Sequence, residues 1–255
     1  TRHRTNVPQC TEVLDYCDNV GINQGDKFGI IGPNGSGKTT LVKDILHRAL
    51  KRKLENAGDV AGEHSQISGD VDSISQIEMI DQNPLGRSSR SNPVTYVKAY
   101  DAIRKLFANQ QLSKIRGFAA KHFSFNTEGG RCETCKGDGE ILVEMQFLAD
   151  IHLVCDDCNG RRFKPNVIDV KYKDKSIFDV LNMSIEEGLA FFEGHRDIVR
   201  RMQPLVDVGL GYVKLGQSSS TLSGGEAQRV KLASYLSKGG RINPILFIFI
   251  LIKFI

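Results

Sequence analysis

The 255-residue sequence predicts an α/β fold that combines a phosphate-loop core, a helical subdomain and an inserted cysteine-rich module. Three observations support this prediction. The stretch GPNGSGKT at 32–39 follows an apolar, β-prone segment and opens a helical pattern. The stretch LSGGE at 222–226 opens a second helix after a serine-rich turn. Two CxxC pairs lie between these motifs in a glycine-rich, basic stretch.

Composition indicates a globular protein with a core of its own. Apolar residues make up 40% of the chain, and the net charge of +4 permits contact with nucleic acid without requiring it. The longest apolar run, 245–252, is far shorter than the about 20 residues of a membrane span, and no leader is apparent. We therefore expect a cytoplasmic protein with no membrane partner. Because the first residue is Thr1, the chain reads as a piece of a longer protein.

The first third of the chain reads as strand, loop, helix, linker and strand. DKFGII at 26–31 predicts the first strand, and TLVKDILHRAL at 40–50 predicts the helix after the loop. The polar stretch 51–72 predicts a linker, and ISQIEMIDQ predicts a second strand that ends at Gln82. Residues 83–93 then predict a loop, and 94–108 an amphipathic helix.

The last third predicts a hairpin and two helices. VIDVKYKDKSI at 167–177 indicates a hairpin that turns at Asp174-Lys175, and SIEE at 184–187 is a capping box that opens a helix. The apolar faces of the two helices consist of Ile185, Leu189 and Phe192 in the first, which Gly194 ends, and of Ala227, Val230, Ala233 and Leu236 in the second.

The phosphate loop carries the clearest chemistry. Its glycines let backbone N–H groups turn toward phosphates, the following helix adds partial positive charge, Lys38 would bridge the β- and γ-phosphates, and Thr39 would reach Mg²⁺. The predicted nucleotide ligands are Gly32, Pro33, Asn34, Gly35, Ser36, Gly37, Lys38, Thr39 and Thr40. The alternative is a glycine-rich turn with a surface lysine.

The second glycine motif resembles the signature motif of ABC ATPases. In that family two nucleotide-binding halves pack head to tail, which implies that Ser223, Gly224, Gly225 and Glu226 would complete a site on the opposite half. Gln82 would match the glutamine that senses magnesium and water. The alternatives are an ordinary N-capped helix and a surface glutamine.

Four cysteines have the spacing of a metal centre. Cys132 and Cys135 lie in CETCKGDG, and Cys155 and Cys158 in CDDCNG. Four thiolates close the shell of a tetrahedral Zn²⁺, so the metal would be structural, with a binding energy on the order of 10 kcal/mol. Redox-active or merely buried thiols are the alternative. His122 and His152 are possible substitutes, whereas Cys10 and Cys17 are expected to be ordinary thiols.

Basic residues surround the quartet. Beside the aromatic FSF at 123–125, they suggest contact with nucleic-acid phosphates, and a solvated basic face is the alternative. These candidate DNA-binding residues are Arg131, Lys136, Arg161, Arg162 and Lys164.

Three longer stretches carry a family resemblance. They are DQNPLGRSSRSNP, FSFNTEGGRCETCKGDGEILVEMQFLADIHLVCDDCNGRRF and DVGLGYVKLGQSSSTLSGGEAQRVKLA. Together they resemble the C-terminal nucleotide-binding half of the UvrA family, which senses damage in the bacterial excinuclease. Ser223 follows Lys38 by 185 residues, wider than in a transporter ATPase, and GPNGSGKTT departs from the family's usual loop. The resemblance implies a dimeric ATPase that binds ATP, Mg²⁺, Zn²⁺ and damaged double-stranded DNA, and docks the B component of the excinuclease through an N-terminal half absent here.

The resemblance also divides the chain into five segments. These are an ATP-binding core (1–82), a loop and helix (83–127), a zinc insertion (128–164), the signature subdomain (165–240) and an aberrant Walker B strand (241–255). In the family an Asp-Glu pair would follow Phe249, where Ile250 stands. We therefore expect truncation before the Walker B acids, no intact catalytic residue, and binding without appreciable hydrolysis. Alternatives are a zinc-dependent binding module of DnaJ type and the ATPase of an ABC transporter.

Overall fold

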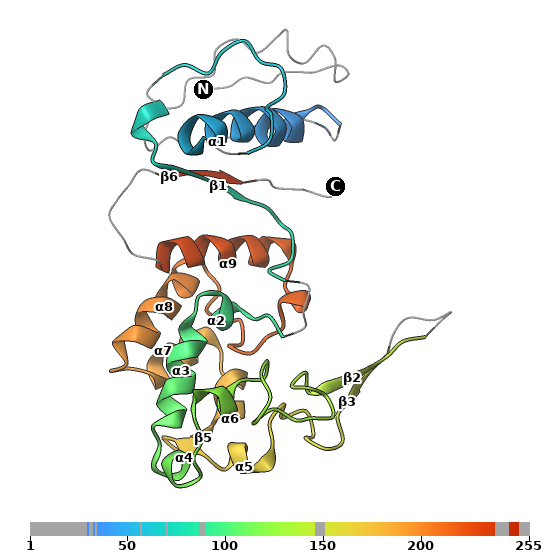
Figure 1. The fold of residues 1–255 in the computed structure, drawn as a ribbon, viewed down its shortest axis with the longest axis vertical. Coiled ribbons are helices and arrows are strands. Elements are labelled where there is room, and N and C mark those ends of the chain that lie inside the picture. The colour runs from blue at the N-terminus through green and yellow to red at the C-terminus, as the bar shows by residue number, and fades with distance from the viewer. Residues whose placement is uncertain are drawn as a thin grey trace. The chain divides into compact units, whose positions relative to one another are not determined.

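The computed structural model describes residues 30, 33, 35–56, 58–69, 71–86, 90–145, 151–237 and 245–249 (Figure 1). The chain divides into two compact units: one comprises Thr1–Asp81 and Gly240–Ile255, the other Gln82–Gly239. None of the helices in the described ranges has both the length and the apolar content to cross a lipid bilayer.

The first unit holds a helix and a pair of parallel strands. The helix opens as a π-helix, η1 (Thr40–His47), and continues as α1 (Arg48–Glu55). Strand β1 (Gln76–Ile80) follows the 3-10 turn η2 (Val71–Ser73) and pairs in parallel with β6 (Ile245–Phe249), from the far end of the chain. The small core of this unit consists of Leu50, Val71, Ile77 and Ile248.

These elements confirm part of the predicted α/β core. The helix after the phosphate loop and the strands at 76–80 and 245–249 are present, although β1 ends at Ile80, two residues before Gln82. The predicted strand at 26–31 lies outside the described residues except for Ile30, which is in no strand.

The predicted linker at 51–72 is wrong in its first part, because the helix continues to Glu55. The ion pairs Arg48–Asp44 (3.2 Å) and Lys51–Glu55 (4.0 Å), both at i,i+4 spacing, support this extension, and Leu50 is buried. The helix ends at Asn56, which adopts the left-handed conformation (φ 51°) typical of a C-terminal cap.

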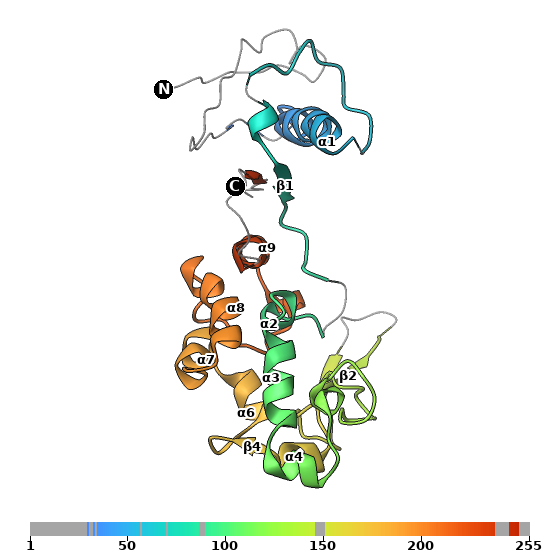
Figure 2. The same ribbon diagram turned by 60° about the vertical axis from the view of Figure 1, so that its left-hand side comes forward.

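The second unit is mainly helical. Its helical elements are α2 (Pro93–Tyr96), α3 (Ala99–Ala108), α4 (Gln111–Ile115), η3 (Ala120–Phe123), α5 (Pro165–Ile168), α6 (Ile177–Asn182), α7 (Ile185–Phe191), α8 (Arg196–Asp207), η4 (Ser219–Thr221) and α9 (Gly224–Ser237). One continuous apolar core joins them, with Phe107, Phe123, Phe163 and Phe192 fully buried in it. The long helices of this unit are α3, α8 and α9, of which α9 is seen side-on in Figure 1 and along its axis in Figure 2.

The amphipathic helix predicted at 94–108 is two helices. Asn92 caps α2 by accepting a hydrogen bond from the Thr95 amide (2.9 Å), and the chain then turns through Lys98 in the left-handed region (φ 60°) before α3 begins. Periodicity alone could not reveal this break, because the apolar positions on both sides of it lie in the same core.

The hairpin and the capping box predicted downstream are present. Strands β4 (Lys171–Tyr172) and β5 (Lys175–Ser176) pair across a turn at Lys173-Asp174, one residue earlier than predicted, with both φ angles positive (45° and 61°). The Ser184 hydroxyl accepts from the Glu187 amide (3.1 Å) at the start of α7.

A further hairpin belongs to the cysteine-rich segment and projects from the helices of its unit in both views (Figures 1 and 2). Strands β2 (Glu140–Val143) and β3 (Ile151–Val154) pair antiparallel, and all eight residues are exposed. The opposed pairs Ile141–Leu153 and Val143–Ile151 alternate with Leu142–His152, so the first two place four aliphatic side chains on one face.

Candidate metal centre and nucleotide-binding motifs

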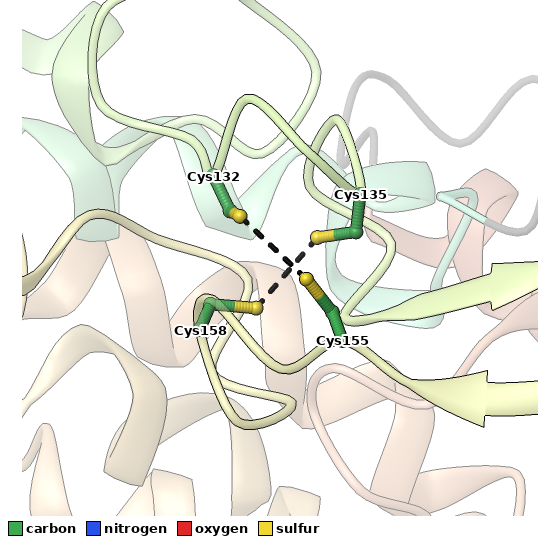
Figure 3. Close-up of side chains that lie close together, drawn as sticks. All are labelled: Cys132, Cys135, Cys155 and Cys158. Atoms are coloured by element: carbon green, nitrogen blue, oxygen red, sulfur yellow. Dashed lines mark hydrogen bonds between the residues drawn. The ribbon is translucent and has the colours of Figure 1, made fainter.

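The four predicted cysteines converge on one point (Figure 3). Their sulfurs all lie within 4.8 Å of one another, and the cross pairs are 3.9 Å apart for Cys132 and Cys155 and 3.7 Å for Cys135 and Cys158. A tetrahedral zinc with Zn–S bonds of about 2.3 Å requires sulfurs about 3.8 Å apart. The donor set and its spacing therefore fit a four-coordinate Zn²⁺.

Backbone contacts hold the two knuckles together. The Cys132 amide donates to the Arg162 carbonyl (2.9 Å) and the Cys155 amide donates to that of Gly139 (3.0 Å), so each knuckle is tied to the other. The Gly139 amide donates to the Cys135 sulfur (3.2 Å), as a thiolate ligand would require. Gly137 has φ 92°, and a Cβ there would lie 2.1 Å from the Phe125 carbonyl oxygen, so the turn needs glycine.

Burial raises the pKa of two of the four thiols. It raises the pKa of Cys135 and raises the pKa of Cys158 to about 12. At neutral pH the two thiols therefore keep their protons until a cation displaces them, which makes metal binding dependent on pH. The four thiolates would leave no open coordination position, so a bound metal would be structural.

Neither candidate histidine joins this cluster. His152 lies on β3, 63% exposed, and pairs with Glu140 (3.3 Å). His122 bonds through Nδ1 to the backbone of Ala119 (3.0 Å). Among the described residues, the four cysteines are the one group of three or more potential ligands that lies close enough to hold a metal. Cys10 and Cys17 lie outside the described residues.

The phosphate loop turns at its glycines. Gly35 (φ 84°) and Gly37 (φ 76°) occupy the left-handed region, and Lys38 lies where the chain enters the helix. The Lys38 Nζ donates to the Pro33 carbonyl (2.5 Å) and the Ser36 hydroxyl (3.3 Å), so its ammonium faces the loop's own oxygens. Thr39 and Thr40 are exposed, whereas Gly32 and Asn34 lie outside the described residues. The positive φ angles of Gly35 and Gly37 are compatible with the turn of a phosphate-binding loop.

The signature stretch is a capping box at the start of α9. The Ser223 amide and hydroxyl both donate to Glu226 Oε2 (2.7 and 2.9 Å), and the Glu226 amide donates to the Ser223 hydroxyl (3.3 Å). Gly224 and Gly225 are the first two residues of the helix, and their N–H groups have no carbonyl earlier in the helix to bind. Ala227, Val230 and Ala233 are buried as predicted, but Leu236 is 50% exposed.

Gln82 lies beside this helix within the second unit. Its Nε2 donates to Gln228 Oε1 (3.4 Å), and a Cβ on Gly224 would be 3.0 Å from the Gln82 Cβ. The structure thus brings Gln82 and the signature turn together, which the sequence did not indicate.

The five candidate DNA-binding cations differ in their surroundings. Arg131 is buried and bonds the Asn126 carbonyl (3.2 Å), and Arg162 donates to the Gly216 carbonyl (3.1 Å). Lys164 pairs with Glu133 (2.9 Å), and this contact lowers the pKa of Glu133. Lys136 and Arg161 are exposed.

The aromatic residues at 123–125 do not line a basic surface. Phe123 and Phe125 are fully buried in the core, where Phe125 packs edge-on against Phe163. The suggested pairing of aromatics with basic residues is therefore wrong, because these rings anchor the cysteine-rich segment to the helices.

Two partners of the candidate site were missed by sequence reasoning. Arg90 forms a bidentate ion pair with Asp138, which lies inside CETCKGDG. Its Nε donates to Oδ1 (3.3 Å) and its Nη2 donates to Oδ2 (3.4 Å). The Tyr212 hydroxyl donates to Glu226 Oε1. Both pairs join residues far apart in the sequence, and no local pattern indicates such contacts.

Comparisons with known proteins decide the family. The family described as ABC transporter matches residues 18–128. UvrABC system protein A of Halalkalibacterium halodurans is 50% identical over 220 residues, and that of Streptomyces avermitilis 53% over 219. The chain belongs to the UvrA family of the ABC ATPase superfamily.

The match covers most of this chain but a minor part of its relatives. Each UvrA alignment spans 86% of this chain, and 23% and 22% of the respective relatives. The crystal structure of UvrA2 from Deinococcus radiodurans matches with a TM-score of 0.75 and 42% identity, over 85% of this chain and 25% of that one. The chain thus spans about a quarter of the length of the UvrA proteins that it resembles, with the phosphate loop, the signature turn and the cysteine centre all inside it.

Proposed function

We propose that this chain is a segment of a UvrA-type ATPase of bacterial nucleotide excision repair that binds Mg²⁺-ATP, Zn²⁺ and damaged double-stranded DNA. One observation carries the proposal: a phosphate loop, a capped signature turn and a four-cysteine centre occur together in a chain about half identical to UvrA proteins. The DnaJ and transporter alternatives each account for only part of this combination.

The described loop residues supply the nucleotide contacts in this proposal. Lys38 would exchange the Pro33 carbonyl and the Ser36 hydroxyl for phosphate oxygens, and Thr39 would hold Mg²⁺. A second copy, or another nucleotide-binding half, would present its own Ser223–Glu226 turn to the γ-phosphate. We infer nucleotide-driven self-association from this requirement. From the similarity to UvrABC system protein A we also infer docking of the B component of the excinuclease, through a part of the UvrA proteins that the alignments do not cover.

The metal would be structural, and DNA would contact the exposed cations near it. The four cysteines would hold Zn²⁺, which would fix the base of the β2–β3 hairpin and the two loops that carry Lys136 and Arg161. Lys136 and Arg161 are the candidates best placed for phosphate contact, because they alone of the five are exposed at the surface.

The first experiment measures nucleotide binding and zinc content on the purified chain. Wild type should bind a fluorescent ATP analogue with Mg²⁺ and carry about one zinc per chain. Lys38→Ala should weaken nucleotide binding about tenfold or more, because it removes a charge-assisted hydrogen bond. Lys43→Ala is the matched control, since this exposed lysine lies further along the same helix. Equal binding by both variants would contradict the assignment of the loop.

A further inference from the structure

Tyr212 has a place at the signature turn that no motif assigns to it. Its side chain is 62% exposed, yet its hydroxyl donates a hydrogen bond to Glu226 Oε1 across 14 residues of sequence. The other carboxylate oxygen, Oε2, accepts from the amide and the hydroxyl of Ser223. One carboxylate therefore links Tyr212 to Ser223.

Two anchors fix the loop that carries Tyr212. Arg229 of α9 donates to the carbonyls of Val208 (3.4 Å) and Gly209 (3.1 Å). On the other side the Glu186 amide of α7 donates to the Gly211 carbonyl (3.1 Å). A Cβ at Gly211 would lie 2.1 Å from Glu186 Oε1, so a larger residue there would have to displace the exposed Glu186 side chain. The position of Tyr212 is therefore set by α7 and α9, not by the exposed ring itself.

We propose that Tyr212 is a positioning residue for Ser223, acting through Glu226. It holds Glu226 in the conformation that caps α9, and so fixes the Ser223 hydroxyl and the adjoining Gly224 and Gly225 amides that would meet a γ-phosphate. This inference rests on the proposed function for its consequence, because the phosphate is that of a nucleotide bound by another copy.

The electrostatics explain why a hydroxyl is needed there. The hydrogen bond from Tyr212, together with the Ser223 amide and nearby Arg229, lowers the pKa of Glu226. An anion beside a phosphate site repels the phosphate, and the Tyr212 donor draws part of that charge away from the turn. Because the pKa in the folded state is depressed, the capping contact is present at neutral pH and is lost as the pH falls through that pKa.

The first test follows the Glu226 carboxyl carbon and the Ser223 amide by NMR during a pH titration of the whole chain. Glu226 should titrate below the usual range in wild type, and Tyr212→Phe should raise its midpoint, with the Ser223 amide following the same curve. Tyr172→Phe is the matched control, because that hydroxyl bonds His195 instead (2.8 Å). Equal midpoints in wild type and Tyr212→Phe would overturn the proposal.

The second test measures self-association with Mg²⁺-ATP by analytical ultracentrifugation. Tyr212→Phe should weaken association about three- to tenfold. In a Glu226→Gln background, where the carboxylate charge is gone, the same change should have little effect, so the two positions should be coupled in a double-mutant cycle. Additive effects would overturn the proposal. Absence of association by wild type would contradict the proposed function, while the NMR titration would still decide the role of Tyr212.

Discussion

At the scale of single residues, burial separates cations that look alike in the sequence. Arg131, Arg162 and Lys164 are held by protein oxygens, and Arg131 is only 9% exposed. Arg131 and Arg162 connect the cysteine-rich segment to residues outside it, and Lys164 forms its ion pair within the segment. A phosphate group would have to displace an existing partner to reach them, whereas Lys136 and Arg161 meet solvent.

We therefore predict that Lys136→Ala combined with Arg161→Ala weakens DNA binding and lowers its salt dependence. Loss of two phosphate contacts should reduce the slope of log K against log salt by about 1.8. Fluorescence anisotropy of a labelled duplex at several salt concentrations measures this slope. Lys171→Ala, at an exposed position of β4 in the same unit, is the control. An unchanged slope in the double variant would place the DNA contact elsewhere.

The residues that sequence could predict are those whose chemistry is local. The CxxC spacing predicted the cysteine cluster, and the Ser-x-x-Glu pattern predicted the box that the structure shows at Ser184. The burial of the aromatic rings could not be predicted from the sequence. FSF at 123–125 suggested a surface aromatic patch, whereas Phe125 packs against Phe163 in the core. The Tyr212–Glu226 contact depends on how α8 leads into α9, and nothing near Tyr212 encodes it.

At the scale of elements, residues 82–86 and 90–92 contact both the cysteine-rich segment and the signature helix within the second unit. Arg90 pairs with Asp138 in the first knuckle, and the Ser91 carbonyl accepts from the Ser219 amide (2.7 Å) just before the signature turn. Lys231 of α9 donates to the Asn83 carbonyl (2.8 Å). These residues thus contact both the first cysteine knuckle and the signature helix α9.

We predict that Asp138→Asn lowers zinc affinity about tenfold, because Asp138 orients the turn whose Gly139 amide binds the Cys135 sulfur. Competition with a zinc chelator measures the affinity. Asp156→Asn removes an exposed carboxylate inside the second knuckle and serves as the control for net charge. If both variants lose zinc equally, charge rather than the Arg90 contact is responsible.

Two helical elements differ from what the sequence predicted. Apolar periodicity over 94–108 predicted one helix, but Lys98 in the left-handed region makes it two. The polar composition of 51–72 predicted a linker, but the Lys51–Glu55 ion pair and buried Leu50 support a helix that continues to Glu55. The apolar pattern does not contain the break at Lys98, and the burial of Leu50 is a tertiary contact. The Lys51–Glu55 pair, in contrast, is local and can be read from the sequence.

At the scale of the whole molecule, strands from distant parts of the chain share one sheet. Strand β6 pairs in parallel with β1, with Phe249 opposite Ile80. In an ATPase of this superfamily, the acids that hold magnesium and activate water follow such a strand, and we propose that they are missing because Ile250 and Leu251 stand at those positions. Nucleotide would then bind without appreciable turnover.

We predict that Ile250→Asp combined with Leu251→Glu confers ATP hydrolysis on the chain, since it restores carboxylates directly after β6. Phosphate release under saturating Mg²⁺-ATP measures the gain, which should vanish when Lys38→Ala is added. Ile250→Asn with Leu251→Gln is the matched control, because it brings polarity without charge. Turnover by the unaltered chain would mean that another carboxylate acts, and that the strand after Asn243 is not where this chain's catalytic acids belong.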